Sequence, residues 1–233
     1  MPEVCRVTKY RDVAEARVPL ALVTDKAVAS TDYDDETPVE RYYRFQSSVY
    51  DATRWTFLFG RSKILRRVAD RGSPERILEV GCGTGRNLLE LACLFPAARI
   101  TGVDLSKAML ERARRKTASV DSRVELVHGR YDKPLYSTPR FDLVLFSYSL
   151  TMFNPGFELA IESARSDLVQ GGYAATVDFH DSPLPWFTSW MQINHVRTDG
   201  QLRPLLPRRF QPLHDELRLA YGGAWRYFLF LGQ

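Results

Sequence analysis

The chain has 233 residues, 45% of them apolar and 26% charged, with 32 basic and 28 acidic side chains and a net charge of +4. This composition excludes a wholly disordered protein and allows one large domain or two small ones. No apolar run approaches the roughly 20 residues of a membrane-spanning helix, and the basic excess fits either an anionic partner surface or an arginine-rich soluble enzyme.

Residues 1–39 are predicted to form a leader and linker. They end in an acidic, turn-rich stretch, residues 30–38, whose charges we interpret as solvated. Acidic residues also interrupt the basic region that a secretory signal needs. The cysteines have no C-x-x-C spacing, which argues against a disulfide framework or structural zinc site and favours a reducing cytoplasm: Cys5, Cys82 and Cys93.

Residues 40–71 are predicted to form an N-terminal helical cap, in which aromatic side chains alternate with basic ones. Gly60 is expected to separate two helices, and the second, residues 61–71, places an apolar stripe on one face: Ile64, Leu65 and Val68. The stripe packs on the protein's own core or contacts a membrane surface. We favour core packing for most of these residues.

From Gly72 to the C-terminus, short apolar strands alternate with helices, and Gly or Pro stands at most joints. Such alternation predicts a domain over residues 72–233, with a parallel sheet covered on both faces. The final segment predicts a closing hairpin with an antiparallel edge strand, and residues 183–212 form an insertion rich in Trp, His, Arg and Pro. The expected strands are 76–80, 99–103, 124–127, 141–147, 173–179, 213–220 and 225–231, and the expected helices are 87–94, 107–115 and 157–168.

The strongest functional signal is Glu79-Val80-Gly81-Cys82-Gly83-Thr84-Gly85, in which a strand runs into a glycine-rich turn before a helix. The glycines let the backbone approach a ligand, and the N–H groups of the following helix face it. A dinucleotide fingerprint needs its third glycine one position later, where Arg86 stands. Glu79 is also a poor neighbour for a pyrophosphate and a good one for a cation, so the motif argues against NAD.

A second acidic residue, Asp104, ends the next expected strand in Gly102-Val103-Asp104-Leu105-Ser106. Its position is close to the offset of about 20 residues at which a carboxylate binds a ribose diol. An adenosine that carries a positive charge near the glycine turn satisfies both acidic residues. S-adenosylmethionine has this chemistry.

Together with Met109-Leu110, these motifs resemble the class I S-adenosylmethionine-dependent methyltransferases, from about residue 76 to the C-terminus. The resemblance implies a Rossmann-like, mostly parallel α/β sheet of seven strands in the order 3-2-1-4-5-7-6. It also implies S-adenosylmethionine as methyl donor and S-adenosylhomocysteine as product. The implied contacts are Glu79 to the ammonium, Gly81, Gly83 and Gly85 to the methionyl part, Asp104 to the ribose, Leu105 to the adenine, and Ser147 and Tyr148 to the methionyl side. Arg130 occupies a position that is usually acidic near the adenine, so the backbone N–H of Tyr131 is the alternative contact.

The sequence of residues 49–60 resembles the corresponding segment of enzymes that methylate lipid headgroups. It is more distantly similar to enzymes that methylate quinones. An aromatic helix at this point is expected to close over the cofactor, with Tyr50 and Arg54 reaching the methionyl carboxylate. Further acceptor contacts are expected after the fifth strand, because the carboxyl ends of parallel strands face the ligand. The candidates there are Asp178, His180, Trp186, His195 and Arg197, and a packed or surface histidine is the alternative for both imidazoles.

With residues 225–232, these features resemble the bacterial betaine-lipid branch, which methylates the amine of diacylglyceryl-homoserine three times. Soluble phosphatidylethanolamine N-methyltransferases are close relatives of that branch. An α-amino group titrates near ~7.7–8.0, so a weak base or a water chain suffices. The candidate catalytic residues are Tyr50, Tyr148 and His180, and the candidate aromatic partners of a quaternary product are Tyr43, Tyr50, Tyr148 and Trp186. No metal is expected, because His180-Asp181 alone does not form a ligand cluster.

The sequence therefore predicts a cytoplasmic N-methyltransferase, peripherally bound to the inner membrane, that acts on a lipid headgroup amine at an anionic surface. Diacylglyceryl-homoserine is the favoured acceptor, and an enzyme that makes this lipid is a candidate partner. Phosphatidylethanolamine, a quinone and a soluble small molecule are alternative acceptors, and a silent cofactor-binding subunit is the non-enzyme alternative. A nucleic acid is the weakest choice, because Ser147-Tyr148-Ser149-Leu150 differs from the Asn/Asp-Pro-Pro-aromatic tetrapeptide of amino-methylating enzymes.

Overall fold

The computed structural model describes residues 57–153 and 155–233. The leader and linker expected over residues 1–39 lie outside this part of the chain, as does most of the expected cap, including Tyr43, Tyr50 and Arg54. The roles expected of these three side chains therefore stay predictions.

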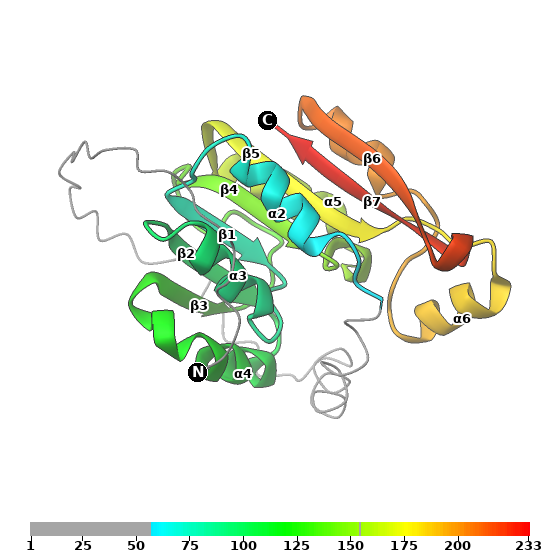
Figure 1. Ribbon diagram of the computed structural model, residues 1–233, viewed down its shortest axis with the longest axis horizontal. Coiled ribbons are helices and arrows are strands. Elements are labelled where there is room, and N and C mark those ends of the chain that lie inside the picture. Colours follow the sequence, from blue (N-terminus) through cyan, green and yellow to red (C-terminus); the bar gives the residue numbers. More distant parts are fainter. Residues whose placement is uncertain (1–56, 154) are drawn as a thin grey trace.

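One seven-stranded sheet runs through the described residues in the order β3-β2-β1-β4-β5-β7-β6 (Figure 1). Strands β1 to β5 pair in parallel, whereas β7 pairs antiparallel with both β5 and β6. The predicted fold class and strand order are thereby confirmed. The strands are β1 (Arg76–Val80), β2 (Arg99–Asp104), β3 (Val124–His128), β4 (Phe141–Ser147), β5 (Leu168–Phe179), β6 (Pro212–Ala220) and β7 (Trp225–Gly232).

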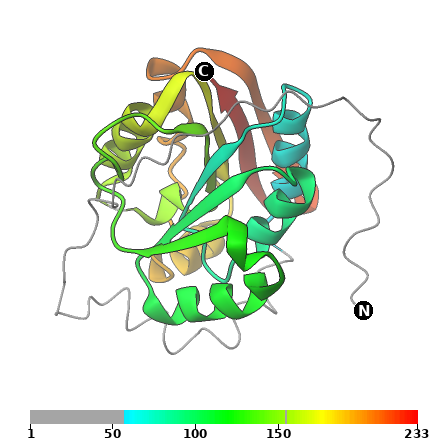
Figure 2. The same ribbon diagram turned by 90° about the vertical axis from the view of Figure 1, so that its left-hand side faces the viewer.

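Helices cover both faces of the sheet, and in Figure 2 α2 and α5 lie on opposite sides of it. One buried apolar cluster joins the sheet to α2, α3 and α4, and a second joins it to α5. The central strands β1 and β4 between these layers are buried along nearly their whole length and are mostly apolar, as is typical of strands covered on both faces. The helices are α2 (Arg61–Ala69), α3 (Arg86–Leu94), α4 (Lys107–Thr117), α5 (Phe157–Asp167) and α6 (Pro185–Ile193), with short 3₁₀ turns η1 (Ala118–Arg123), η2 (Leu150–Met152), η3 (Arg203–Arg208) and η4 (Tyr221–Gly223).

The apolar stripe of α2 packs on the protein's own core. Ile64, Leu65 and Val68 are each 1% exposed, and α2 contacts β5 and β7. The helix begins after Gly60, whose φ of 81° belongs to the left-handed region. A Cβ at Gly60 would lie 2.9 Å from the Tyr227 ring, so glycine permits both the turn and the close packing.

The structure differs from the sequence expectation in two places after α5. Strand β5 begins at Leu168 rather than Tyr173, because the chain crosses Gly171, at φ 80°, through a shift in its register with β4. The insertion after β5 contains a helix, α6, that was not predicted. Pro185 occupies its first turn, where proline needs no hydrogen-bonding N–H and favours helix initiation.

The register of the strands determines where a ligand can bind. Val80 in β1 pairs with Val103 in β2 and with Phe146 in β4, and Ser147 in β4 pairs with Val177 in β5. The carboxyl ends of these four strands therefore meet at one edge of the sheet, which we call the carboxyl edge. Open α/β sheets bind ligands at this edge.

Candidate active site

The glycine-rich turn links β1 to α3 at the carboxyl edge. Gly81, Gly83 and Gly85 all have φ between 53° and 77°, the left-handed region that suits glycine. A Cβ added to Gly81 would lie 2.5 Å from the Cβ of Ser149, so the turn passes directly against the chain that follows β4. The N–H of Gly81 donates to the carbonyl of Val103 at 2.8 Å, which ties the turn to β2.

Glu79 places a buried carboxyl group beneath this turn. Its side chain is 1% exposed, and its Oε1 accepts a 2.7 Å hydrogen bond from Asn87 Nδ2 in the first part of α3. Burial raises the pKa of Glu79 to about 8, although the Asn87 hydrogen bond and the positive charge of Arg61 oppose the rise. A cationic ligand near this group would favour its ionised form.

Three buried oxygens near this point have no hydrogen-bond partner among the described residues: Glu79 Oε2, Ser147 Oγ and Ser149 Oγ. They come from the adjacent ends of β1 and β4. Buried polar atoms are usually hydrogen-bonded, so the arrangement suits a ligand that brings its own N–H donors. The ammonium group of a methionyl moiety meets this requirement, and the site fits S-adenosylmethionine here.

Asp104 is held in place by two main-chain donors at the end of β2. Its Oδ2 accepts from the N–H of Gly83 at 2.7 Å, and its Oδ1 accepts from the N–H of Ser106 at 2.9 Å. An ionised carboxylate accepts hydrogen bonds through both oxygens, so a carboxylate fixed at the carboxyl edge suits the hydroxyls of a ribose. Ser106 then caps α4 through its Oγ, which accepts from Met109 N at 3.4 Å.

The residues expected around the adenine follow Asp104 in β2 and end β3. Leu105 is half-buried and its carbonyl lies 2.8 Å from His128 Nε2. Arg130 is exposed and pairs with Asp132 at 3.8 Å. The Tyr131 ring instead turns inward to Phe146, and its hydroxyl donates to Asp167 at 2.6 Å, so only the backbone of Tyr131 is a candidate contact for an adenine.

Tyr148 is a buried hydrogen-bond donor that links two segments at the carboxyl edge. Its hydroxyl donates to the carbonyl of Phe59 at 2.7 Å, and its ring lies edge-on to Phe179 with centroids 4.8 Å apart. Burial raises the pKa of Tyr148 well above its usual value. The hydroxyl is therefore neutral and committed to Phe59, which does not suit the role of a base.

Asp178 faces the interior rather than the carboxyl edge. It is fully buried, and it accepts hydrogen bonds from Thr151 Oγ1 at 2.5 Å and from the N–H groups of Thr151 and Phe179. The expected direct contact with an acceptor is thus replaced by a positioning role, in which Asp178 holds η2 against the end of β5. Burial raises the pKa of Asp178 to about 6.

His180 and Arg197 come together in a small pocket that Thr151, Phe157 and Gly200 also line. Burial lowers the pKa of His180, against the opposing charge of Asp181, and its Nδ1 has no hydrogen-bond partner in the described part of the chain. The guanidinium of Arg197 binds Asp199 at 2.5 Å and lies over the Phe157 ring. The His180 ring packs edge-on against Phe228 of the second cluster, away from the face on which Tyr148 lies.

Trp186 and His195 do not line this pocket. Trp186 is 67% exposed on α6, and His195 is exposed just after the helix with a φ of 59°. The structure thus groups His180 with Arg197 but separates both from the other two candidates.

Comparison with known proteins identifies the central part of the chain. Residues 77–172 match the family model described as a methyltransferase domain. Demethylmenaquinone methyltransferases of Staphylococcus aureus strains JH9 and Newman are 30% identical over 154 residues, which is 64% of this chain. The chain spans 63% of the length of these relatives.

Over residues 77–172 the chain is similar to methyltransferase domains.

Solved structures agree with this methyltransferase domain at the level of the fold. The N-methyltransferase NodS of Bradyrhizobium japonicum WM9, in complex with S-adenosyl-L-homocysteine, has a TM-score of 0.62 and 18% identity, over 87% of this chain and 92% of its own. The 1,6-didemethyltoxoflavin-N1-methyltransferase of Burkholderia thailandensis, with bound S-adenosylhomocysteine, has a TM-score of 0.63 and 20% identity, over 94% and 93%. The class I fold inferred from the glycine motif is thereby confirmed.

Sequence reasoning missed several residues of the methyltransferase domain and its surroundings: Arg61, Asn87, Ser149 and Thr151. Asn87 could have been found, because it lies in the first turn of the helix that follows the glycines and is polar on a face that packs inward. Arg61, Ser149 and Thr151 influence or contact residues that are distant in sequence, so no local sequence pattern indicates their roles.

Within residues 57–153 and 155–233, no group of three or more His, Cys, Asp or Glu side chains is placed to hold a metal ion. Over the same residues, no helix is both long and apolar enough to cross a bilayer.

Proposed function

We propose that this chain transfers methyl groups from S-adenosylmethionine to the headgroup amine of a membrane lipid. The observation that carries the cofactor assignment is the buried Glu79 carboxyl group, whose Oε2 has no partner among the described residues. An ammonium donates to this oxygen, while Asp104, preset by Gly83 and Ser106, accepts from the ribose hydroxyls. Bound there, S-adenosylmethionine supplies an electrophilic methyl group on a sulfonium.

The state of Tyr148 favours nitrogen as the acceptor atom. Its hydroxyl donates to Phe59 and has a raised pKa, so it is a poor base at neutral pH. An amine with a pKa near ~8 is partly neutral and attacks with its own lone pair, whereas a hydroxyl or ring carbon must first lose a proton. Nitrogen gains the methyl group as the carbon–sulfur bond breaks, and the proton then leaves to water or to the neutral imidazole of His180.

The proposed acceptor is diacylglyceryl-homoserine, which would become the trimethylhomoserine betaine lipid after three transfers. Among the described residues, the segments that resemble the betaine-lipid branch include the stretch after β5 and strand β7. Strand β5 ends at the carboxyl edge, and β7 begins there because it runs antiparallel to β5. In this proposal the protein binds peripherally on the cytoplasmic side of the inner membrane. An enzyme that makes the homoserine lipid is then its functional partner, and phosphatidylethanolamine is a chemically similar acceptor.

Methylation of a quinone is the second candidate function. The 30% identity with demethylmenaquinone methyltransferases favours it. It requires a base for the ring substrate, and within the described residues His180 is the candidate, because burial keeps its imidazole neutral.

Radiolabelled S-adenosylmethionine distinguishes these acceptors. The purified full chain is incubated with vesicles that contain diacylglyceryl-homoserine, phosphatidylethanolamine or demethylmenaquinone, and separately with a water-soluble homoserine ether that lacks acyl chains. We expect label in the homoserine lipid and none with Asp104→Ala. Label only in the quinone would replace the proposal with the second function, and cofactor binding without transfer to any acceptor would indicate a silent binding subunit.

A further inference from the structure

Helix α6 exposes an apolar stripe to solvent. Trp186, Trp190 and Ile193 are 67%, 45% and 74% exposed, and their spacing places them on one face of the helix. The opposite face carries Phe187 and Met191, which are buried. Within the described part of the chain, the helix is thus anchored by one apolar face while a second apolar face stays largely exposed, which is unusual for a surface helix.

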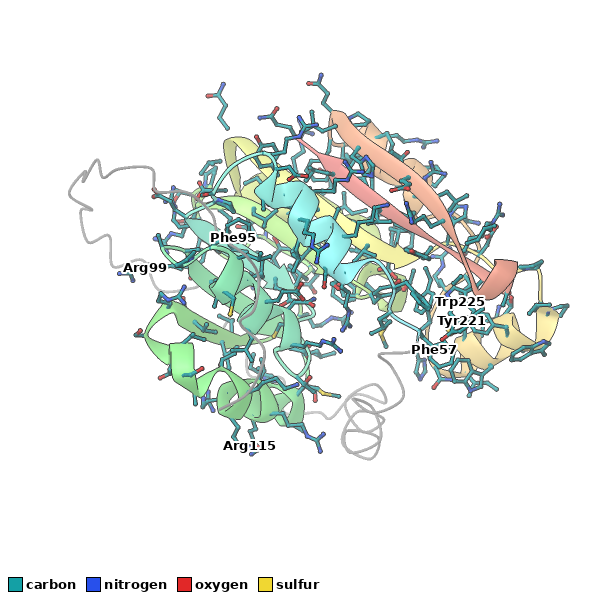
Figure 3. The ribbon with its side chains drawn as sticks, viewed as in Figure 1. Phe57, Phe95, Arg99, Arg115, Tyr221 and Trp225 are labelled. Carbon is teal, nitrogen blue, oxygen red and sulfur yellow. The ribbon has the colours of Figure 1, made fainter. Side chains whose placement is uncertain are left out.

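Aromatic rings extend this surface beyond α6. Phe57 lies between Trp190 and Trp225, with centroids 5.7 and 5.3 Å away. Trp225 in turn contacts Tyr221 at 4.9 Å, and Tyr221 is 61% exposed. Figure 3 shows Phe57, Tyr221 and Trp225 gathered beside α6. We call the exposed members of this surface, Trp186, Trp190, Ile193 and Tyr221, the α6 face.

The α6 face lies at the carboxyl edge of the sheet. Helix α6 follows β5 and η4 follows β6. Because β5 and β6 each pair antiparallel with β7, they run in the same direction and end at the same edge. Figure 1 shows α6 and the turn between β6 and β7 at that end of the sheet. The glycine turn after β1 lies at this edge too, so the α6 face and the candidate active site are on the same side of the molecule.

The charge pattern of the α6 face indicates what it contacts. Residues 184–196 contain no Asp, Glu, Lys or Arg. The charged side chains on either side are paired, Asp181 with Arg226 and Arg197 with Asp199. The face therefore offers no net charge for an anionic partner, since the nearest charged groups are paired with each other. Tryptophan and tyrosine without neighbouring charge complement the water–hydrocarbon boundary of an electrically neutral bilayer.

We propose that the α6 face docks on a lipid bilayer and inserts Trp186, Trp190 and Ile193 at the boundary between headgroups and acyl chains. This orientation brings the carboxyl edge to the membrane, where an amine on a lipid headgroup reaches the site without leaving the bilayer. The inference rests on the proposed function for its purpose, since only a membrane-borne acceptor needs it. In this proposal the protein attaches to the membrane by inserting apolar side chains, not by electrostatic attraction to anionic lipids.

Co-sedimentation with phosphatidylcholine vesicles that contain no amine acceptor tests the docking alone. We expect the full chain to bind and to remain bound when salt is raised about tenfold, because Debye screening weakens exposed charge pairs and not apolar insertion. The double variant Trp190→Ser/Ile193→Ser should reduce the partition coefficient by roughly tenfold or more. Leu159→Ser, at an exposed position on α5 (55% exposed), is the matched control and should bind as the wild type does.

Methylation of the water-soluble homoserine ether by the same variants separates docking from catalysis. The double variant should keep wild-type turnover on this compound and wild-type affinity for S-adenosylhomocysteine, which also shows that it is folded. Unchanged vesicle binding by the double variant, or binding abolished by salt, would overturn the docking inference, as would self-association through α6 without vesicle binding. Vesicle binding that depends on α6 without methylation of any lipid amine would sustain the docking and refute the proposed function.

Discussion

The two halves of the sheet contrast in how they present polar and apolar groups. The half that contains β1, β2 and β3 places acidic side chains on fixed main-chain donors, as when Asp104 accepts from Gly83 and Ser106. The half that contains β5, β6 and β7 surrounds the carboxyl edge with aromatic rings, several of them exposed. The first half is preorganised for a polar ligand, and in the proposed function the second half offers its apolar surface to the acceptor. Comparison of variants in the two halves tests this division.

Gly81→Ala should have the largest effect. The added Cβ meets Ser149 at 2.5 Å, and the φ of 74° is unfavourable for alanine. We expect a loss of about 2–4 kcal/mol in the free energy of unfolding and no detectable cofactor binding, as measured by denaturant titration and calorimetry. Gly222→Ala, at a φ of 67° with no atom within 4 Å, is the control and should cost about 1 kcal/mol. Equal losses in the two variants would show that packing against Ser149 is unimportant.

Asp104→Ala should weaken S-adenosylhomocysteine binding by about 10- to 100-fold. The substitution removes charge-assisted hydrogen bonds to the ribose and also the hydrogen bond that Asp104 accepts from the N–H of Gly83. Isothermal calorimetry measures the change. Vesicle binding through the α6 face should be unaffected, since that surface belongs to the other half. Wild-type cofactor affinity in this variant would contradict the placement of the ribose.

Glu79→Gln should change the pH dependence of both stability and binding. Burial raises the pKa of Glu79 from 4.5 to about 8 in the folded protein. A raised folded-state pKa gives a stabilising contribution that is complete below about pH 4.5 and is lost as the pH rises through about 8. Glutamine cannot ionise, so the variant should lose less stability than the wild type between about pH 5 and pH 9 in parallel thermal melts.

The same substitution tests the ammonium contact. Wild-type affinity for S-adenosylhomocysteine should increase from about pH 6 to pH 8. Over this range a growing fraction of the free protein has Glu79 ionised, and the ionised carboxylate is the form that binds the ammonium. The affinity of Glu79→Gln should be weaker by about tenfold and should change little with pH. Parallel pH profiles for the two proteins would exclude Glu79 as the group that receives the ammonium.

His180→Ala and Tyr148→Phe should have the smallest effects and should differ from each other. We expect His180→Ala to lower kcat by roughly three- to tenfold at unchanged cofactor affinity, because it removes a proton acceptor that water partly replaces. Tyr148→Phe should keep most of the turnover and lose about 1 kcal/mol of stability with the Phe59 hydrogen bond. The opposite pattern, with turnover lost in Tyr148→Phe alone, would make Tyr148 the proton acceptor.

The contrast between the halves also explains which features could be predicted from the sequence. The strand–turn–helix around Gly81 and the acid at the end of β2 are local patterns, so the fold, Glu79 and Asp104 follow from short stretches of chain. The contact of Ser149 with Gly81 and the electrostatic influence of Arg61 on Glu79 join segments far apart in sequence, and no local periodicity records them. Helix α6 was missed because both of its faces are apolar and prolines flank its start. Asp178 was expected at the acceptor because the end of a parallel strand indicates the edge of a sheet, not the direction of a side chain.

The reversal of β7 determines where the protein can be attached to a support. Gln233 follows the end of β7, and its N–H and carbonyl bond to Gln211, just before β6 begins. Because β7 runs against β5, this terminus lies at the far side of the sheet from α6 and the glycine turn (Figure 1). A tether or fluorescent fusion placed after residue 233 would therefore leave the carboxyl edge accessible. Immobilised through residue 233, the described part of the chain would expose the carboxyl edge, where the candidate active site lies.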